Sequence, residues 1–328
     1  MKKHKKVIII ILCCLLSVLV IAGIVIVCVL SKNDLETKPE ELKTVGDRIH
    51  FINTRNSDAI LLESDGKFAL VDAAEDSDNV RNLKELNYRG YEDRVIDYLK
   101  EYAANENGKI HLEFVVGTHS HSDHIGGFDT IINHPDVTVD RAYLKVYDSS
   151  KIDLHEVENW DNQEVYDQMV EALNNKSIPI ISDMDSTPFE FGNFTITLMN
   201  TDDPESEEKV GENDQSLGVL IEKNGTRIFL AGDIDNKSGD ETRLAPQIGK
   251  VHLLKPGHHG YDDSSTEEWM QILSPDNCVI TNTPFRLSLF RIKYFDQMTK
   301  DKVYYTASEN GVIAEIFDNG EIKYHTGR

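Results

Sequence analysis

Three histidines and an aspartate lie between positions 119 and 124, in the segment THSHSDHIGG at residues 118–127. The residues just before it, 111–116, form an apolar run that predicts a buried strand. Imidazole and carboxylate groups are the usual ligands of zinc and similar divalent ions, and a tight loop at a strand end can direct alternate side chains toward two neighbouring points. We therefore predict a metal site here; the alternatives are a solvated histidine-rich turn and a single closed site.

Two later apolar runs also end in residues that bind metals. Residues 227–232 lead into Asp233, and residues 251–256 lead through a glycine to His258 and His259. Two cations held about 3.5 to 4 Å apart repel each other unless a carboxylate bridges them, and Asp233 is suited to that role. The pattern predicts a centre for two metal ions, with ligands delivered by several strand ends.

Taken in order, these motifs resemble the metallo-β-lactamase superfamily over about residues 46–326. The similarity is strongest to the branch that contains the C-terminal domain of ComEC-type competence proteins and the phosphorylcholine esterases. The matching elements are DAIL at residues 58–61, LVDA at 70–73, THxHxDHxGG at 118–127, GD at 232–233 and HHG at 258–260. The resemblance implies an α/β (α+β) fold with the four layers αββα. These motifs are specific for the fold and the metal site and carry little information on the substrate.

The resemblance also implies a role for each motif residue. The implied ligands are His119 and His121 for the first metal, Asp123 and His124 for the second, and Asp233 for both. His259 is the favoured further ligand, with His258 beside the leaving group or phosphate, although the order of this pair is open. Asp72 would orient a ligand histidine from behind, or else serve as a cap or turn residue. Asp123 is also expected to orient the attacking water.

One histidine that the resemblance implies is missing. True lactamases and lactonases of this family have a further histidine between the HxHxDH and GD elements, whereas only His134 and His155 lie in that interval here, and both come too early. The matching place is residues 213–217, NDQSL, where Asn213 is a candidate residue behind the ligands. The first metal would keep three protein ligands and leave room for water and an anionic substrate oxygen. This departure favours phosphoesters over β-lactams.

A helix is expected at about residues 156–173. Its Trp160 and Tyr166 are open to two interpretations, which are contact with a substrate and packing in the core. Core packing is at least as well supported by the sequence.

An uncharged, mostly apolar run at residues 7–30 follows the basic flank KKHKK at residues 2–6. At 1.5 Å per residue this helix would measure about 36 Å, enough to span a hydrocarbon core of roughly 30 Å with some tilt. The positive-inside rule puts the basic flank in the cytoplasm. We expect a cytoplasmic flank at residues 1–6, one transmembrane helix at 7–30, a linker at 31–45 and an extracellular domain at 46–328. The alternative is a cleaved signal peptide, whose apolar region is normally only about 7 to 15 residues.

The chain carries 57 acidic residues against 34 lysines and arginines, which gives a formal net charge of −23. Such a surface repels polyanions, whereas proteins that bind nucleic acid typically present a basic footprint. Nucleic acid is therefore an unfavoured partner. The solubility of an exported domain explains the acidity more simply.

Together these features predict a membrane-anchored, extracytoplasmic hydrolase with two divalent metal ions, for which zinc is the first choice. The ions would lower the pKa of a bridging water and polarise the substrate oxygen. The favoured substrate is a phosphoester or phosphodiester, either a small molecule or a cell-surface group. The enzyme alternatives are a ComEC-like nuclease and another hydrolase of this fold, a lactonase or lactamase. The non-enzymatic alternative is a membrane-tethered binding module.

Protease added to intact cells is expected to digest the domain at residues 46–328, because the basic flank and the apolar run put it outside the membrane. Immunoblots of the full chain before and after digestion measure this, with a cytoplasmic protein as the control for cell integrity. A domain that stays protected, or that is released as a shorter soluble form, would contradict the anchor.

Overall fold

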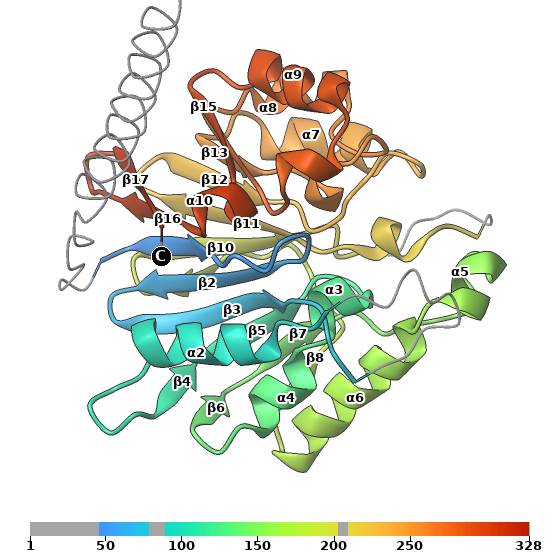
Figure 1. Cartoon of the computed structure of the whole chain (residues 1–328), viewed down its shortest axis with the longest axis vertical. Helices are drawn as coiled ribbons and strands as arrows, with labels where there is room; N and C mark the ends of the chain where they lie inside the picture. The colour runs from blue at the N-terminus through green and yellow to red at the C-terminus, as the bar shows by residue number, and fades with distance from the viewer. Residues whose placement is uncertain (1–45, 79–88, 203–208, 328) are drawn as a thin grey trace, which may run out of the picture. The chain divides into compact units, whose positions relative to one another are not determined.

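The computed structural model describes residues 46–78, 89–202 and 209–327 (Figure 1). Two mixed β-sheets pack face to face, and helices cover the outer face of each sheet. In Figure 1 the helices of one outer layer are α2 (Glu92–Tyr102), α4 (Phe128–Asn133) and α6 (Asn162–Asn175), and those of the other are α7 (Asp240–Ile248), α8 (Glu267–Leu273) and α9 (Leu289–Met298). The mixed α/β fold with αββα layers is therefore the one that the sequence predicts.

The first sheet has eight strands and joins the beginning of the domain to its end. Its order is β17 (Ile322–Thr326), β16 (Val312–Ile316), β1 (Arg48–Phe51), β2 (Ala59–Ser64), β3 (Lys67–Ala73), β5 (Phe114–Gly117), β7 (Ala142–Leu144) and β8 (Ile180–Ile181). The pairs from β17 to β3 are antiparallel, and those from β3 to β8 are parallel. A separate parallel pair joins β4 (Ile110–Leu112) to β6 (Val137–Val139).

The second sheet has seven strands and the same division into two parts. Its order is β15 (Lys302–Tyr305), β14 (Asn277–Ile280), β13 (Leu253–Lys255), β12 (Thr226–Leu230), β11 (Gly218–Lys223), β10 (Phe194–Met199) and β9 (Phe189–Phe191). Strands β15 to β12 pair in parallel and strands β12 to β9 pair antiparallel. Three short helices lie in connections: α3 (Ser122–Ile125), α5 (Leu154–Asn159) and α10 (Thr306–Glu309).

Three apolar clusters hold the layers together, one between the sheets and one under each outer layer of helices. Strand β3 contributes to two of them, because successive side chains of a strand point to opposite faces. Leu70 packs against the helices, whereas Ala69 and Val71 pack between the sheets. Strands that are covered on both faces read as continuous apolar runs. This explains why the runs before the polar motifs show little alternation.

Parallel strands deliver the polar motifs to one edge of the fold. Strands β3 and β5 pair in parallel in the first sheet, as β12 and β13 do in the second. Parallel neighbours end at the same edge of their sheet, which is where ligands bind in open α/β sheets. The histidine motif follows β5, Asp233 follows β12, and the His258-His259 pair follows β13.

No helix of the described residues is long and apolar enough to cross a membrane. The predicted transmembrane run, residues 7–30, lies outside the residues that the structure describes.

A buried ion pair joins the two sheets at the end opposite to the motifs. Lys223, at the end of β11, lies 2.5 Å from Asp47 Oδ2 and donates a hydrogen bond to the Ile316 carbonyl of β16. Asp47 also accepts hydrogen bonds from Ser64 Oγ and Asn193 Nδ2. Burial raises the pKa of Asp47, but the hydrogen bonds from Lys223, Ser64 and Asn193 outweigh it and lower that pKa below its ordinary value. The pair therefore stays charged at neutral pH.

Replacing Lys223→Met is expected to lower the free energy of unfolding by about 3 kcal/mol, because it leaves Asp47 buried without its cation. Urea unfolding followed by far-UV circular dichroism measures this. The matched control is Lys250→Met, since Lys250 pairs with Asp276 at 3.0 Å but its side chain is 53% exposed. Such exposed pairs contribute about 0 to 1 kcal/mol. Equal losses in the two variants would contradict the role of the buried pair.

Candidate metal centre

The strand ends bring five of the six predicted ligands together in two buried groups, and Asp123 belongs to neither group. The first cluster consists of His119, His121 and Asp233, and the second contains His124, His259 and Asp233, with Asp58 beside them. Within each group the possible ligand atoms lie within 4.8 Å of one another. His119 Nε2 is 2.9 Å from His121 Nδ1, and His124 Nε2 is 3.2 Å from His259 Nε2. Asp233 is the residue that belongs to both clusters.

The structure also separates the two members of the HHG pair. His259 is 1% exposed, and its Nε2 lies 3.2 Å from Asp123 Oδ2. The side chain of His258 is 24% exposed, with its Nδ1 2.6 Å from Asp263 Oδ1 and its Nε2 3.9 Å from Asp233 Oδ2. His259 therefore lies within the second cluster, and His258 lies at its rim.

The local backbone explains how these histidines are presented. His258 and His259 both have positive φ, 43° and 48°, in the 3₁₀ turn that follows β13. The 3₁₀ turn lies so close to the turn after β12 that a Cβ on Gly257 would collide with the Ile234 carbonyl. Glycine before the pair therefore permits the close approach that brings His259 to the second cluster.

Asp72 reaches the site through a β-bulge. The register of β2 against β3 shifts between Ala59 and Ile60, and Asp72, with φ 58°, is the additional residue of β3. Its Oδ2 lies 2.7 Å from His124 Nδ1, and its Oδ1 accepts a hydrogen bond from the Thr118 backbone at 2.8 Å. Asp72 therefore links the end of β3 to the histidine motif after β5.

Three of the four clustered histidines have a carboxylate behind the ring. His124 has Asp72, His259 has Asp58 with Oδ1 3.2 Å from Nδ1, and His121 has Glu156 with Oε1 2.8 Å from Nε2. His119 has the Thr118 hydroxyl 3.1 Å from its Nδ1. Histidines that bind metals commonly donate a hydrogen bond from the N–H of their second ring nitrogen to a carboxylate or a carbonyl, and this bond fixes the tautomer. The donor set and the groups behind it therefore fit divalent metal ions.

Lys255 and Asp58 lie at the centre, although the motif analysis did not single out either as a site residue. Lys255, the last residue of β13, is fully buried, forms an ion pair with Asp58, and lies 3.5 Å from Asp233 Oδ1. Its Nζ also donates to the Gly232 carbonyl at 2.6 Å. The signal for both was present in the sequence, because Lys255 is a charged residue within an apolar run and Asp58 is the first residue of the DAIL motif.

The buried charges stabilise one another. Burial raises the pKa of Asp233, but His124, His259 and Lys255 hold it well below its ordinary value. Burial lowers the pKa of His124, but Asp233 and Asp72 raise it well above its ordinary value. The same balance raises the pKa of His259 to about 10. Asp233 thus stays ionised among these partners.

Asn213 does not join the clusters. It is buried in the 3₁₀ turn Glu212–Gln215, and its side-chain oxygen accepts no hydrogen bond from the described residues. The neighbouring Glu212 accepts a hydrogen bond from the Ser120 backbone at 2.9 Å, so the turn packs against the histidine motif through Glu212 and not through Asn213.

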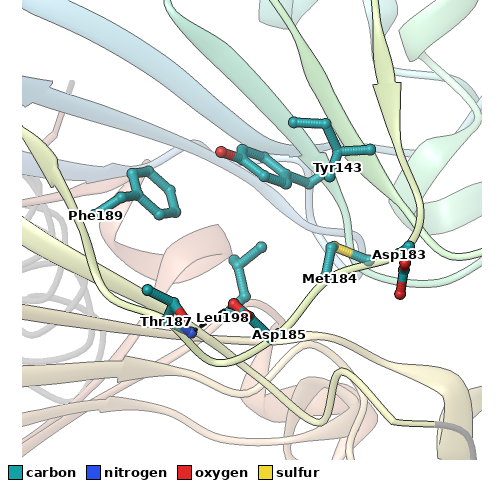
Figure 2. Close-up of a pocket in the computed structure, with 8 residues that line it drawn as sticks. Tyr143, Asp183, Met184, Asp185, Thr187, Phe189 and Leu198 are labelled. Carbon is teal, nitrogen blue, oxygen red and sulfur yellow. Dashed lines mark hydrogen bonds between the residues drawn. The ribbon is translucent and has the colours of Figure 1, made fainter.

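A cleft of about 430 Å³ borders the first cluster. Its lining includes Glu156, Trp160, Lys209 and Lys237, and the Trp160 ring lies 4.7 Å from the His121 ring between centroids. A second hollow, of about 370 Å³, opens where β7 and β8 face β9 and β10 (Figure 2). Figure 2 shows Tyr143 and Phe189 extending into it from opposite sides, and none of its lining residues is a candidate ligand.

Comparison with known proteins gives a family. Residues 95–256 match the model described as the beta-lactamase superfamily domain. ComE operon protein 3 of Bacillus subtilis (strain 168) is 24% identical over 183 residues, which is 52% of this chain and 20% of that protein. Competence protein ComA of Neisseria gonorrhoeae is 22% identical over 180 residues, 54% of this chain and 21% of that protein. The aligned segment thus spans about a fifth of these relatives.

Among solved structures, the metallo-beta-lactamase fold protein YhfI from Bacillus subtilis superposes with a TM-score of 0.47 at 14% identity, over 79% of this chain and 95% of that chain. The ordered motifs, the family model and the curated relatives agree with one another. The chain belongs to the metallo-β-lactamase superfamily and is ComEC-like.

Proposed function

We propose that the domain is a hydrolase that uses two divalent metal ions, with zinc as the first choice. The observation that carries this proposal is the position of Asp233, within ligand range of both clusters. One carboxylate shared by two groups of imidazole donors suits a pair of cations about 3.5 to 4 Å apart. Bound ions of this kind supply an attacking water of lowered pKa and polarise the substrate oxygen. A non-catalytic binding module would not need this paired arrangement.

Two residues at the mouth of the site have the chemistry for proton transfer. Asp123 is 24% exposed at its side chain and is the least buried of the candidate ligands. Its carboxylate is suited to orient the attacking water and accept its proton. His258 is held through Nδ1 by Asp263, which leaves Nε2 on the side of Asp233. From there it can donate a hydrogen bond to a phosphoryl oxygen or to the leaving group.

A phosphoester or phosphodiester is the substrate that we propose. The first cluster has three protein groups and lacks the further histidine of lactamases and lactonases, so an anionic substrate oxygen has room to approach. The cleft beside it has two lysines in its lining, Lys209 and Lys237, although the chain as a whole has a net charge of −23. Small-molecule and cell-surface phosphoesters both fit this description, while lactone or lactam hydrolysis is the less supported alternative.

A nuclease is the second candidate. The observation that favours it is the similarity to proteins named for competence and recombination, including Recombination protein 2 of Haemophilus influenzae, 26% identical over 103 residues. That alignment covers 31% of this chain and 13% of the relative. The acidic surface opposes the candidate, because binding to the phosphate backbone relies on clustered basic side chains.

We also propose that residues 7–30 anchor the chain in the cell membrane with the N-terminus in the cytoplasm. The support is the uncharged run itself and its basic flank. The hydrolase domain would then act on substrates outside the cell.

Asp233→Asn is expected to lower hydrolysis by orders of magnitude and to reduce bound metal, because asparagine keeps the shape but removes the charge that two cations share. Phosphodiester turnover and elemental analysis measure the two effects. Asp214→Asn is the matched control, since Asp214 is also fully buried but lies outside both clusters. If the Asp233→Asn variant bound two metals and kept near-normal turnover, the bridging role would have to be assigned to another carboxylate.

Zinc-loaded full chain in detergent micelles is expected to bind about two ions and to hydrolyse bis(p-nitrophenyl) phosphate much faster than a lactone or a β-lactam. Release of p-nitrophenol from the phosphodiester and loss of the absorbance of the lactone or lactam ring are measured side by side, with Asp233→Asn protein as the background. Faster cleavage of single-stranded DNA than of a choline phosphodiester would favour the nuclease. Only trace metal after zinc loading would count against the whole site.

A further inference from the structure

The imidazole of His121 is held on three sides. Its Nδ1 lies 2.9 Å from His119 Nε2, inside the first cluster. Its Nε2 lies 2.8 Å from Glu156 Oε1 of helix α5. The Trp160 ring lies beside the His121 ring, with 4.7 Å between the two ring centroids. The side chain is only 5% exposed. The ring therefore has one orientation, in which Nδ1 faces the first metal position.

Glu156 is itself fixed before any ligand arrives. Its Oε1 accepts a hydrogen bond from Asn162 Nδ2 at 2.8 Å, and the backbone N–H of Glu212 lies 3.2 Å from the same oxygen. Glu156 is therefore an oriented carboxylate, placed to accept a hydrogen bond from the imidazole N–H of His121.

This contact matters because a neutral imidazole carries one N–H and one lone pair. A carboxylate at Nε2 keeps the proton on that nitrogen and leaves the Nδ1 lone pair for a metal. The other tautomer would point an N–H into the first cluster. That cluster has three protein groups, so a weakened His121 leaves it with two good donors, whereas the second cluster does not include His121.

We propose that Glu156 is a positioning residue for the first metal site, which it serves by fixing the tautomer and orientation of His121. This inference rests on the proposed two-metal function. Glu156 lies 35 positions after His121, outside every motif of the family resemblance. Loss of the carboxylate empties the first site while the second site keeps its metal.

The experiment uses Trp160 as a reporter of the first site. Co²⁺ is titrated into metal-free full chain in detergent micelles, and tryptophan fluorescence and bound cobalt per chain are both recorded. The quenching that is absent from a Trp160→Phe variant is the Trp160 signal. The chain has two tryptophans, and the other, Trp269, is a buried residue of α8 in the apolar cluster of the opposite outer layer. The variants compared are Glu156→Gln and, as the control on the same helix, Glu158→Gln.

Glu156→Gln is expected to shift the midpoint of Trp160 quenching to roughly 10- to 100-fold higher Co²⁺. Its bound cobalt should fall from about two ions to about one at limiting metal, and thermal unfolding of the metal-free protein should not change. Glu158→Gln should behave like the parent chain. Elemental analysis after zinc loading gives a second measurement that does not depend on fluorescence.

Two outcomes would overturn the inference. An unchanged quenching midpoint in Glu156→Gln would mean that His121 needs no carboxylate behind it. Equal loss of both metals together with a lower unfolding temperature would mean that Glu156 supports the fold and does not position a ligand. A parent chain that binds two ions and turns over substrate keeps the proposed function in either case, whereas a parent that binds none removes the proposed function itself.

Discussion

Asp233 is a carboxylate buried at the point where the ends of strands from both sheets meet, and its charge constrains everything around it. Taking an isolated charge out of water costs several kcal/mol unless hydrogen bonds and opposite charges compensate it. His124 Nε2 lies 3.1 Å away and Lys255 Nζ 3.5 Å away. These partners follow β5 and end β13, so the parallel strands of both sheets are needed to satisfy one side chain. The polar centre therefore depends on the packing of the two sheets against each other.

The groups behind the histidines come from parts of the chain with no motif in common. Asp72 depends on a bulge in β3, Asp58 precedes β2, and Glu156 belongs to α5. Each fixes one imidazole whose other nitrogen faces a cluster. The orientation of the ligands therefore depends on the DAIL and LVDA motifs, which supply Asp58 and Asp72, and on Glu156, which lies outside every motif. Affinity for a metal can accordingly change through substitutions far from the HxHxDH segment.

The rim of the site couples this centre to the adjacent cleft. Lys237 lines the cleft, and its Nζ lies 3.2 Å from Asp235 Oδ2 and 3.6 Å from Asp263 Oδ2. Asp263 in turn contacts His258 Nδ1 through its Oδ1. Glu156 and Trp160 line the same cleft and contact His121. A substrate group placed there would lie against residues that orient both the first cluster and the rim histidine.

The sequence by itself predicted the αββα fold, through the family resemblance of its motifs, and five of the six expected ligands lie in the two clusters. The sixth, Asp123, lies beside the second cluster with Oδ2 3.2 Å from His259 Nε2, and Asp58 joins that cluster without having been expected there. The sequence also favoured His259 over His258 as a ligand, and His259 is the more buried of the two. Asp72 was expected behind a ligand histidine, whereas only the tertiary structure decided that Asp58 lies behind His259 and Glu156 behind His121. The helix expected at residues 156–173 is broken at Trp160, whose extended backbone separates α5 from α6. That break brings Glu156 and Trp160 to His121. Local periodicity does not encode such long-range pairing, since the charge of Glu156 is satisfied by a residue 35 positions away.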